Sequence, residues 1–213
     1  MRRIALASMT GTVIEFYDFF IYGTAAALVF NKIFFPGLGT AAGTAAALAT
    51  FGVAFVARPF GSILFGHFGD RLGRKGTLVT TLMTMGLATL AIGLMPTAAT
   101  IGAAAPILLV LLRILQGLAV GGEWAGAVLL TAENSPPQAR GKFALFPQLG
   151  PSIAFALASA TFLVTTLTMS PESFAAWGWR VPFIASIILV GVGLFVRLKL
   201  EETSVFANAD TKV

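Results

Sequence analysis

The sequence predicts an all-α membrane protein with six transmembrane helices, and three observations support this. Of the 213 residues, 57% are hydrophobic and only 11% are charged, with a mean hydropathy of +0.88. In soluble domains roughly half of the residues are apolar and about a quarter are charged. The apolar residues form six runs near the ~20 residues that a helix needs to cross a bilayer. Short polar segments separate these runs.

The six expected spans form one transmembrane bundle over residues 1–198, and a polar cytoplasmic tail follows over residues 199–213. The spans are 8–30, 42–66, 76–95, 106–131, 143–169 and 181–198. The first run follows a short basic start, but it contains acidic residues and is too long for a cleaved signal peptide. We therefore expect it to be retained as the first helix, with both termini on the same side.

The positions of the 14 Lys and Arg residues predict which side this is. One side of the membrane receives ten of them and the other side receives Lys32 and Arg180; the ten are Arg2, Arg3, Arg71, Arg74, Lys75, Arg140, Lys142, Arg197, Lys199 and Lys212. Cytoplasmic loops of membrane proteins carry such an excess. The expected location is the plasma (inner) membrane with both termini cytoplasmic. This alternation explains the pI of about 10.1 without a nucleic-acid partner.

Three features of the loops and helices lead to further expectations. Trp177 and Trp179 lie in an outer connection, where tryptophan rings suit the headgroup region. Gly117 and Gly121 are four residues apart, a spacing that allows close helix packing in lipid. Gly150-Pro151 is expected to bend the fifth helix, either to shape a cavity or to fit its neighbours.

Five ionisable residues fall within the predicted spans: Glu15, Asp18, Arg58, Arg113 and Glu123. At roughly 2.5 to 3.5 kcal/mol each, five unpaired charges would oppose insertion by about 12 to 18 kcal/mol. They must therefore pair with one another, bind protons or face water. Three carboxylates against two guanidiniums leave one carboxyl in excess, and this carboxyl is a candidate proton carrier.

The same residues define candidate sites for protons and for substrate. Helical spacing puts Glu15, Asp18 and Tyr22 on one stripe of the first helix, and Gln116 beside Arg113 on the fourth. We assign proton coupling to Glu15, Asp18 and Glu123, and substrate binding to Tyr22, Arg58, Arg113 and Gln116. The alternative is a set of fixed salt bridges between helices, with Arg58 extending its charge toward the cytoplasm.

A polar segment between the second and third spans contains a spaced motif. Residues 66–75 read G-H-F-G-D-R-L-G-R-K, which fits a short cytoplasmic turn. The spacing G-x-x-x-D-R-x-G-R-K resembles the signature loop between helices 2 and 3 of major facilitator superfamily transporters. The resemblance implies a gating loop, whose residues here are Gly66, Asp70, Arg71, Gly73, Arg74 and Lys75.

Further segments resemble the metabolite:proton symporter family, whose members carry citrate, 2-oxoglutarate, shikimate, dicarboxylates, proline or betaine with protons. These segments are residues 11–22, 57–61, 113–124 and 178–183. The resemblance implies alternating access and a helix-4 arginine, here Arg113, acting with Asp18 or Glu15. It also implies that the chain corresponds to the N-terminal six-helix half of a twelve-helix fold, built from two three-helix repeats.

The predicted function is that of a half-length, proton-coupled symporter for a small organic acid. The alternatives are a zwitterionic osmolyte symporter half, and a truncated product or membrane scaffold without transport activity. The sequence has no cysteine, one histidine and no G-x-S-x-G elbow, so we expect no enzyme activity, no metal site and no cofactor. Expected partners are the lipid bilayer, the substrate and protons, and a second six-helix half or a homodimer.

Overall fold

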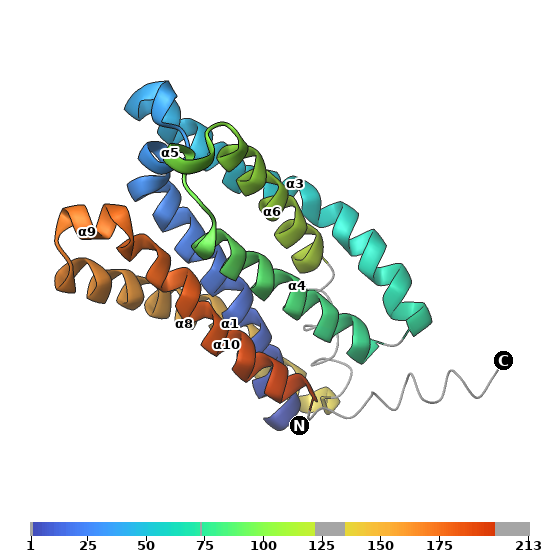
Figure 1. Cartoon of the computed structure of the whole chain (residues 1–213). Coiled ribbons are helices and arrows are strands. Elements are labelled where there is room, and N and C mark those ends of the chain that lie inside the picture. The colour runs from blue at the N-terminus through green and yellow to red at the C-terminus, as the bar shows by residue number, and fades with distance from the viewer. Residues whose placement is uncertain (1, 73, 122–134, 199–213) are drawn as a thin grey trace.

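The computed structural model describes residues 2–72, 74–121 and 135–198, and these form a bundle of helices (Figure 1). Six helical segments are long and apolar enough to cross a membrane: Ala5–Ile33, Pro36–Phe68, Gly76–Leu94, Ala104–Gly121, Gly141–Thr168 and Gly178–Leu198. The described residues contain no β-strand. The predicted all-α fold with six transmembrane helices is therefore confirmed.

Six long helices and several short ones make up the bundle. The long helices are α1 (Arg2–Ala25), α3 (Gly39–Leu72), α4 (Arg74–Leu94), α6 (Ala104–Gly121), α8 (Arg140–Thr168) and α10 (Val181–Leu198). A π-helical turn (Ala26–Phe30) and α2 (Asn31–Ile33) extend α1, and 3-10 turns lie at Pro36–Leu38, Pro137–Ala139 and Gly178–Arg180. The other short helices are α5 (Ala98–Ile101) and α9 (Pro171–Ala176). Residues 122–131 of the fourth expected span and the expected tail, residues 199–213, lie outside the described residues.

The helix pairing agrees with an origin in two three-helix repeats. The main partners are α1 with α8, α3 with α6, α10 with α4, α4 with α6, and α1 with α10. Two three-helix repeats would equate α1 with α6, α3 with α8 and α4 with α10. Under this correspondence the α1–α8 pair becomes the α6–α3 pair, and the α4–α6 pair becomes the α10–α1 pair. The α4–α10 pair maps onto itself. The set of partners is therefore unchanged by the exchange, as internal repeats require.

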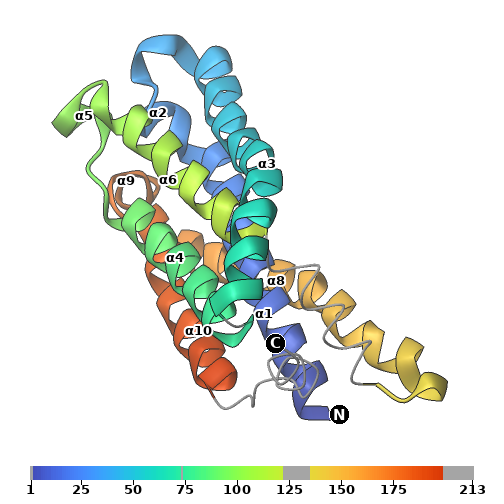
Figure 2. The same ribbon diagram turned by 90° about the vertical axis from the view of Figure 1, so that its right-hand side faces the viewer.

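The connections gather at two opposite ends of the bundle (Figures 1 and 2). One end holds α2, α5 and α9. The other holds the start of α1, the junction between α3 and α4, and the start of α8. The polar segment 66–75 differs from the expected loop, because α3 continues helical to Leu72 and α4 begins at Arg74. No proline interrupts this segment, so the helix continues through its polar residues.

Glycine allows α3 and α6 to pack backbone against backbone. A Cβ on Gly117 would collide with the carbonyl oxygen of Ala54, and one on Gly121 would collide with that of Arg58. On the facing helix, a Cβ on Gly61 would collide with the backbone of Leu118. The spacing of Gly117 and Gly121 thus marks a helix contact. This contact brings Arg58 and Arg113 to the same part of the bundle.

The two outer tryptophans have different environments. Trp177 is exposed, as expected for an interfacial ring, but Trp179 is 0% exposed and packs against Phe30, Phe34 and Phe183. The expectation for Trp179 was wrong. A 3-10 turn directs its ring back into the bundle, where it closes the end of an aromatic core.

Candidate functional site

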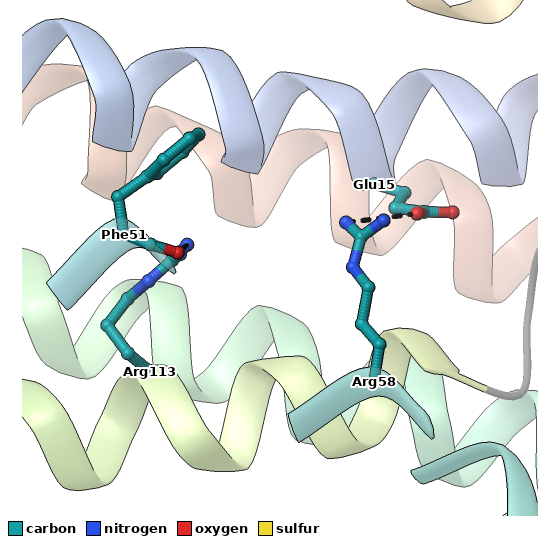
Figure 3. A network of polar contacts seen from close by, with 4 residues as sticks. All are labelled: Glu15, Phe51, Arg58 and Arg113. Atoms are coloured by element: carbon teal, nitrogen blue, oxygen red, sulfur yellow. Dashed lines mark hydrogen bonds and ion pairs between the residues drawn. The ribbon is translucent and has the colours of Figure 1, made fainter. Parts of the chain in front are cut away.

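Arg58 and Glu15 pair across the space between α3 and α1. Arg58 Nη2 lies 3.5 Å from Glu15 Oε1, and Figure 3 shows the guanidinium extending toward the carboxylate. The Glu15 side chain is 2% exposed and that of Arg58 is 30% exposed. Of the two carboxylates on α1, Arg58 therefore pairs with Glu15.

A chain of hydrogen bonds connects Asp18 on α1 with Arg113 on α6. The Thr89 hydroxyl on α4 donates to Asp18 Oδ2 over 2.6 Å. Gln116 Nε2 donates to Thr89 Oγ1 over 2.6 Å, and Arg113 Nη1 donates to Gln116 Oε1 over 2.9 Å. All four side chains are at most 4% exposed. Among the described residues no ion pair joins Asp18 to Arg113, so the link between them passes through two neutral side chains.

Aromatic rings hold the Arg113 guanidinium on its other side. Its Cζ lies 3.9 Å from the centroid of the Tyr22 ring and 5.3 Å from that of Phe51. Arg113 Nη2 also donates to the Phe51 carbonyl over 3.4 Å (Figure 3). The Tyr22 hydroxyl is hydrogen-bonded to Thr50 at 2.5 Å. Cation–π contacts are worth about 2 kcal/mol when desolvated, so these rings offset part of the cost of burying the Arg113 charge.

These groups converge on a narrow cavity of about 20 Å³, lined by Glu15, Asp18, Phe19, Ala54, Arg58, Met85, Arg113, Gln116, Gly117 and Val120. Several buried polar atoms around it have no hydrogen-bond partner: Glu15 Oε2, Asp18 Oδ1, Arg58 Nε and Arg113 Nε. The volume corresponds to about one water molecule. In this conformation the charged groups therefore surround a space too small for an organic substrate.

A wider cavity of about 480 Å³ lies farther along α3. Its lining includes Glu15 and Arg58, together with Phe16, Phe55, Pro59, Ser62, Val120 and Gly121. Pro59 and Ser62 lie in the C-terminal half of α3, and Gly121 ends α6, so this cavity lies toward the end of the bundle where α3 meets α4. The Glu15–Arg58 pair lines both cavities.

Six of the predicted coupling and substrate residues thus meet in one region: Glu15, Asp18, Tyr22, Arg58, Arg113 and Gln116. Glu123 and Gly73 lie outside the described residues. Gly66 is an exposed residue of α3. Asp70 and Arg71 continue the backbone of α3, and Arg74 and Lys75 begin that of α4. The gating role of this segment stays a prediction.

Sequence reasoning missed two polar residues near the site. Thr89 is fully buried, but a single threonine in an apolar helix usually bonds its own backbone, so the sequence contains no signal for its role. Arg197 was counted with the cytoplasmic basic residues. The structure adds that it is 7% exposed and donates to the backbone carbonyl of Leu78, while its side of the membrane stays a prediction. No group of three or more His, Asp or Glu side chains suited to a metal occurs in the part of the chain that the structure describes.

Comparison with known proteins identifies the family. Residues 4–212 match the model of the sugar (and other) transporter family. The chain belongs to this family. It is 56% identical over 204 residues to the inner membrane metabolite transport protein YhjE of Escherichia coli K12, covering 96% of this chain and 46% of that protein. It is 49% identical to the shikimate transporter of the same strain, covering 96% of this chain and 47% of that protein. It is 40% identical to the proline/betaine transporter of Salmonella typhimurium LT2, covering 97% and 41%.

Solved structures share the fold of this sugar transporter family member. The major facilitator superfamily proton:xylose symporter XylE superposes with a TM-score of 0.85 at 19% identity, covering 99% of this chain and 46% of that chain. An inward-open structure of XylE from E. coli superposes with a TM-score of 0.83, covering 98% and 50%. The chain spans about half the length of the proteins it matches, which fits the predicted six-helix half. The resemblance to the major facilitator superfamily and its metabolite symporters is confirmed.

Proposed function

We propose that this chain forms a six-helix half of a proton-coupled symporter for a small organic acid. The observation that carries the proposal is the meeting of two acids and two arginines, Glu15, Asp18, Arg58 and Arg113, around one narrow cavity. The guanidinium group of arginine can bind a carboxylate through two parallel hydrogen bonds. A buried acid that takes up a proton loses its negative charge, so the arginines beside it lose a counter-charge. Proton and substrate binding are thereby linked.

In this mechanism Asp18 or Glu15 takes a proton from the cytoplasmic or external water that reaches the cavity. The arginines then lose part of their negative counter-charge, and Arg113 or Arg58 engages the substrate carboxylate. The cavity of about 20 Å³ must widen to admit a substrate. Rocking of this bundle against a second six-helix unit supplies that movement, as alternating access requires.

The exposed surface is suited to a bilayer and to such a partner. Ile63 on α3 and Leu167 on α8 are more than 70% exposed, and many other large apolar side chains on these helices are exposed. Lipid covers most of this surface in the proposal, and a second half or a second copy of the chain covers the rest. We place the bundle in the inner membrane with both termini cytoplasmic, so that the wider cavity lies toward the cytoplasmic end.

The test is uptake into proteoliposomes with an imposed proton gradient. The purified chain is reconstituted alone and together with the remaining half of a metabolite transporter relative, and radiolabelled shikimate and citrate are supplied. We expect gradient-driven uptake that is lost in Asp18→Asn and Arg113→Gln. Lys32→Gln, which removes an exposed cation that lines neither cavity, is the matched control and is expected to retain uptake. Undiminished proton coupling in both site variants would refute the proposal.

A zwitterionic osmolyte is the alternative substrate, supported by the aromatic rings beside the cavity. Phe19, Phe51 and Phe55 form a contiguous cluster, and such faces attract quaternary ammonium groups. The Tyr22 face, however, is occupied by Arg113. A competition assay, in which unlabelled betaine is added during uptake of labelled shikimate, distinguishes an organic acid substrate from a zwitterionic one. If neither substrate is taken up with or without the second half, the chain acts as a membrane scaffold or truncated product.

A further inference from the structure

The Thr89 hydroxyl has three polar neighbours but only one hydrogen atom. Asp18 Oδ2 and Gln116 Nε2 each lie 2.6 Å from its oxygen, and the Met85 carbonyl lies 3.0 Å away. Arg113 can only donate, so Gln116 must present its oxygen to Arg113 and its NH₂ group to Thr89. One lone pair of Thr89 is therefore always used by Gln116. Its hydrogen can point to Asp18 or to Met85.

Both protonation states of Asp18 satisfy this arrangement. An ionised carboxylate only accepts, so Thr89 must then donate to Asp18 Oδ2. When Oδ2 gains a proton from water, it donates to the second lone pair of Thr89, and the threonine hydrogen rotates to the Met85 carbonyl. No covalent bond of Thr89 breaks, and the only proton gained is the one on Asp18. In both states, every hydrogen bond between Asp18, Thr89, Gln116 and Arg113 has one donor and one acceptor.

The two states differ in how firmly Gln116 is held. A hydroxyl that donates to a charged carboxylate is polarised and becomes a better acceptor, whereas one that accepts two hydrogen bonds is a poorer partner for each. Gln116 in turn holds Arg113. Protonation of Asp18 therefore loosens the contact that keeps Arg113 away from a substrate.

We propose that Thr89 is a positioning residue that transmits the protonation state of Asp18 through Gln116 to Arg113. This inference rests on the proposed proton-coupled function and assigns it a specific path. The charged or titratable groups that interact with Asp18 within the described residues are Glu15 and Tyr17 on α1 and Arg113 on α6, and Arg58 on α3 lines the same cavity. Arg197 on α10 acts on Glu15. These groups act on Asp18 through space, and Thr89 is its hydrogen-bond partner.

The first test is infrared spectroscopy of the purified chain in lipid during a pH titration. The carbonyl stretch of protonated Asp18 is assigned by its loss in Asp18→Asn. Thr89→Val keeps the shape of the side chain but removes the hydroxyl, so we expect the Asp18 band to move to higher frequency. Thr89→Ser, which keeps the hydroxyl, is expected to retain the wild-type band. If Thr89→Val does not fold, Thr89→Ala removes the same hydroxyl with less bulk.

Thr81 provides a matched control on the same helix. It is also fully buried, but its hydroxyl donates to the Leu78 carbonyl of its own helix. Thr81→Val should leave the Asp18 band in place. An unchanged band in both Thr89→Val and Thr89→Ala would show that the proton resides elsewhere, such as on Oδ1, and would overturn the inference.

The second test is proton-driven uptake in the reconstituted system described above. Loss of one hydrogen bond is expected to reduce coupled uptake roughly two- to tenfold in Thr89→Val. Thr89→Ser should restore it, and Thr81→Val should have no effect. If wild-type protein shows no uptake, the proposed function fails, but the infrared result still decides whether Thr89 reports the protonation of Asp18. Uptake by Thr89→Val with unchanged proton dependence would contradict the proposed path.

Discussion

Arg58 of α3 and Glu15 of α1 form an ion pair between a partly exposed base and a buried acid. The distance from Arg58 Nη2 to Glu15 Oε1 is 3.5 Å, and the exposed fractions of the two side chains are 30% and 2%. The pair lines both the narrow charged cavity and the wider one. Under the proposed function, a substrate carboxylate that approaches from the wider cavity therefore meets Arg58 before it reaches Arg113.

Removal of one partner of this pair should be more damaging than removal of both. Arg58→Gln removes the ion-pair partner of the buried Glu15, and because Arg58 is partly solvated we expect a loss of about 1 to 2 kcal/mol in the free energy of unfolding. The double variant Glu15→Gln/Arg58→Gln should recover part of this loss. Thermal unfolding of the wild type, Arg58→Gln, Glu15→Gln and the double variant in detergent measures the interaction. Strictly additive effects would show that the pair contributes no coupling energy.

Close packing of α3 on α6 makes Gly117 intolerant of any side chain. Gly117→Ala places a methyl group against the Ala54 carbonyl, and we expect destabilisation of about 1 to 3 kcal/mol. Gly52 on α3 has no neighbouring atom within 4 Å of a built Cβ, so Gly52→Ala is a matched control. It should be neutral or slightly stabilising because alanine favours helix by about 1 kcal/mol. Equal melting temperatures for both variants would contradict the close-packed interface.

The buried Trp179 should contribute much more to stability than the neighbouring Trp177. Trp179→Ala removes a fully buried ring from the aromatic core, at an expected cost of about 3 to 5 kcal/mol. Trp177 is 52% exposed, so Trp177→Ala should change the free energy of unfolding much less. Chemical unfolding monitored by circular dichroism provides the measurement. A larger loss of stability in Trp177→Ala than in Trp179→Ala would contradict the burial of Trp179 in the aromatic core.

The proposed orientation can be tested by labelling because the native sequence contains no cysteine. Gly37 and Gln138 are exposed residues of two turns, Pro36–Leu38 between α2 and α3 and Pro137–Ala139 before α8, which we expect on opposite sides of the membrane. With both termini cytoplasmic, Gly37→Cys should react with a membrane-impermeant maleimide in intact cells. Gln138→Cys should react only after permeabilisation. The reverse pattern would invert the orientation and place the wider cavity on the external side.

Much of the architecture was predictable because it depends on local properties of the chain. A run of about 20 apolar residues in lipid must satisfy its backbone hydrogen bonds internally, so it becomes a helix whatever its neighbours are. The intramembrane charges were recognisable one by one, since each is costly unless partnered. The boundaries were less predictable: the segment from Gly66 to Lys75 looked like a turn, yet its polar residues extend the helices on both sides.

The sequence by itself therefore determined the class of protein, the number of helices and the charged residues that needed partners. Only the tertiary structure decided that Arg58 pairs with Glu15, that Arg113 is held by Gln116 and Tyr22, and that Trp179 is buried. The role of Thr89 also came from the structure alone. The physical reason is that such contacts depend on how each helix is rotated and crossed against others distant in sequence. That geometry is set by the close packing of small residues across the whole bundle.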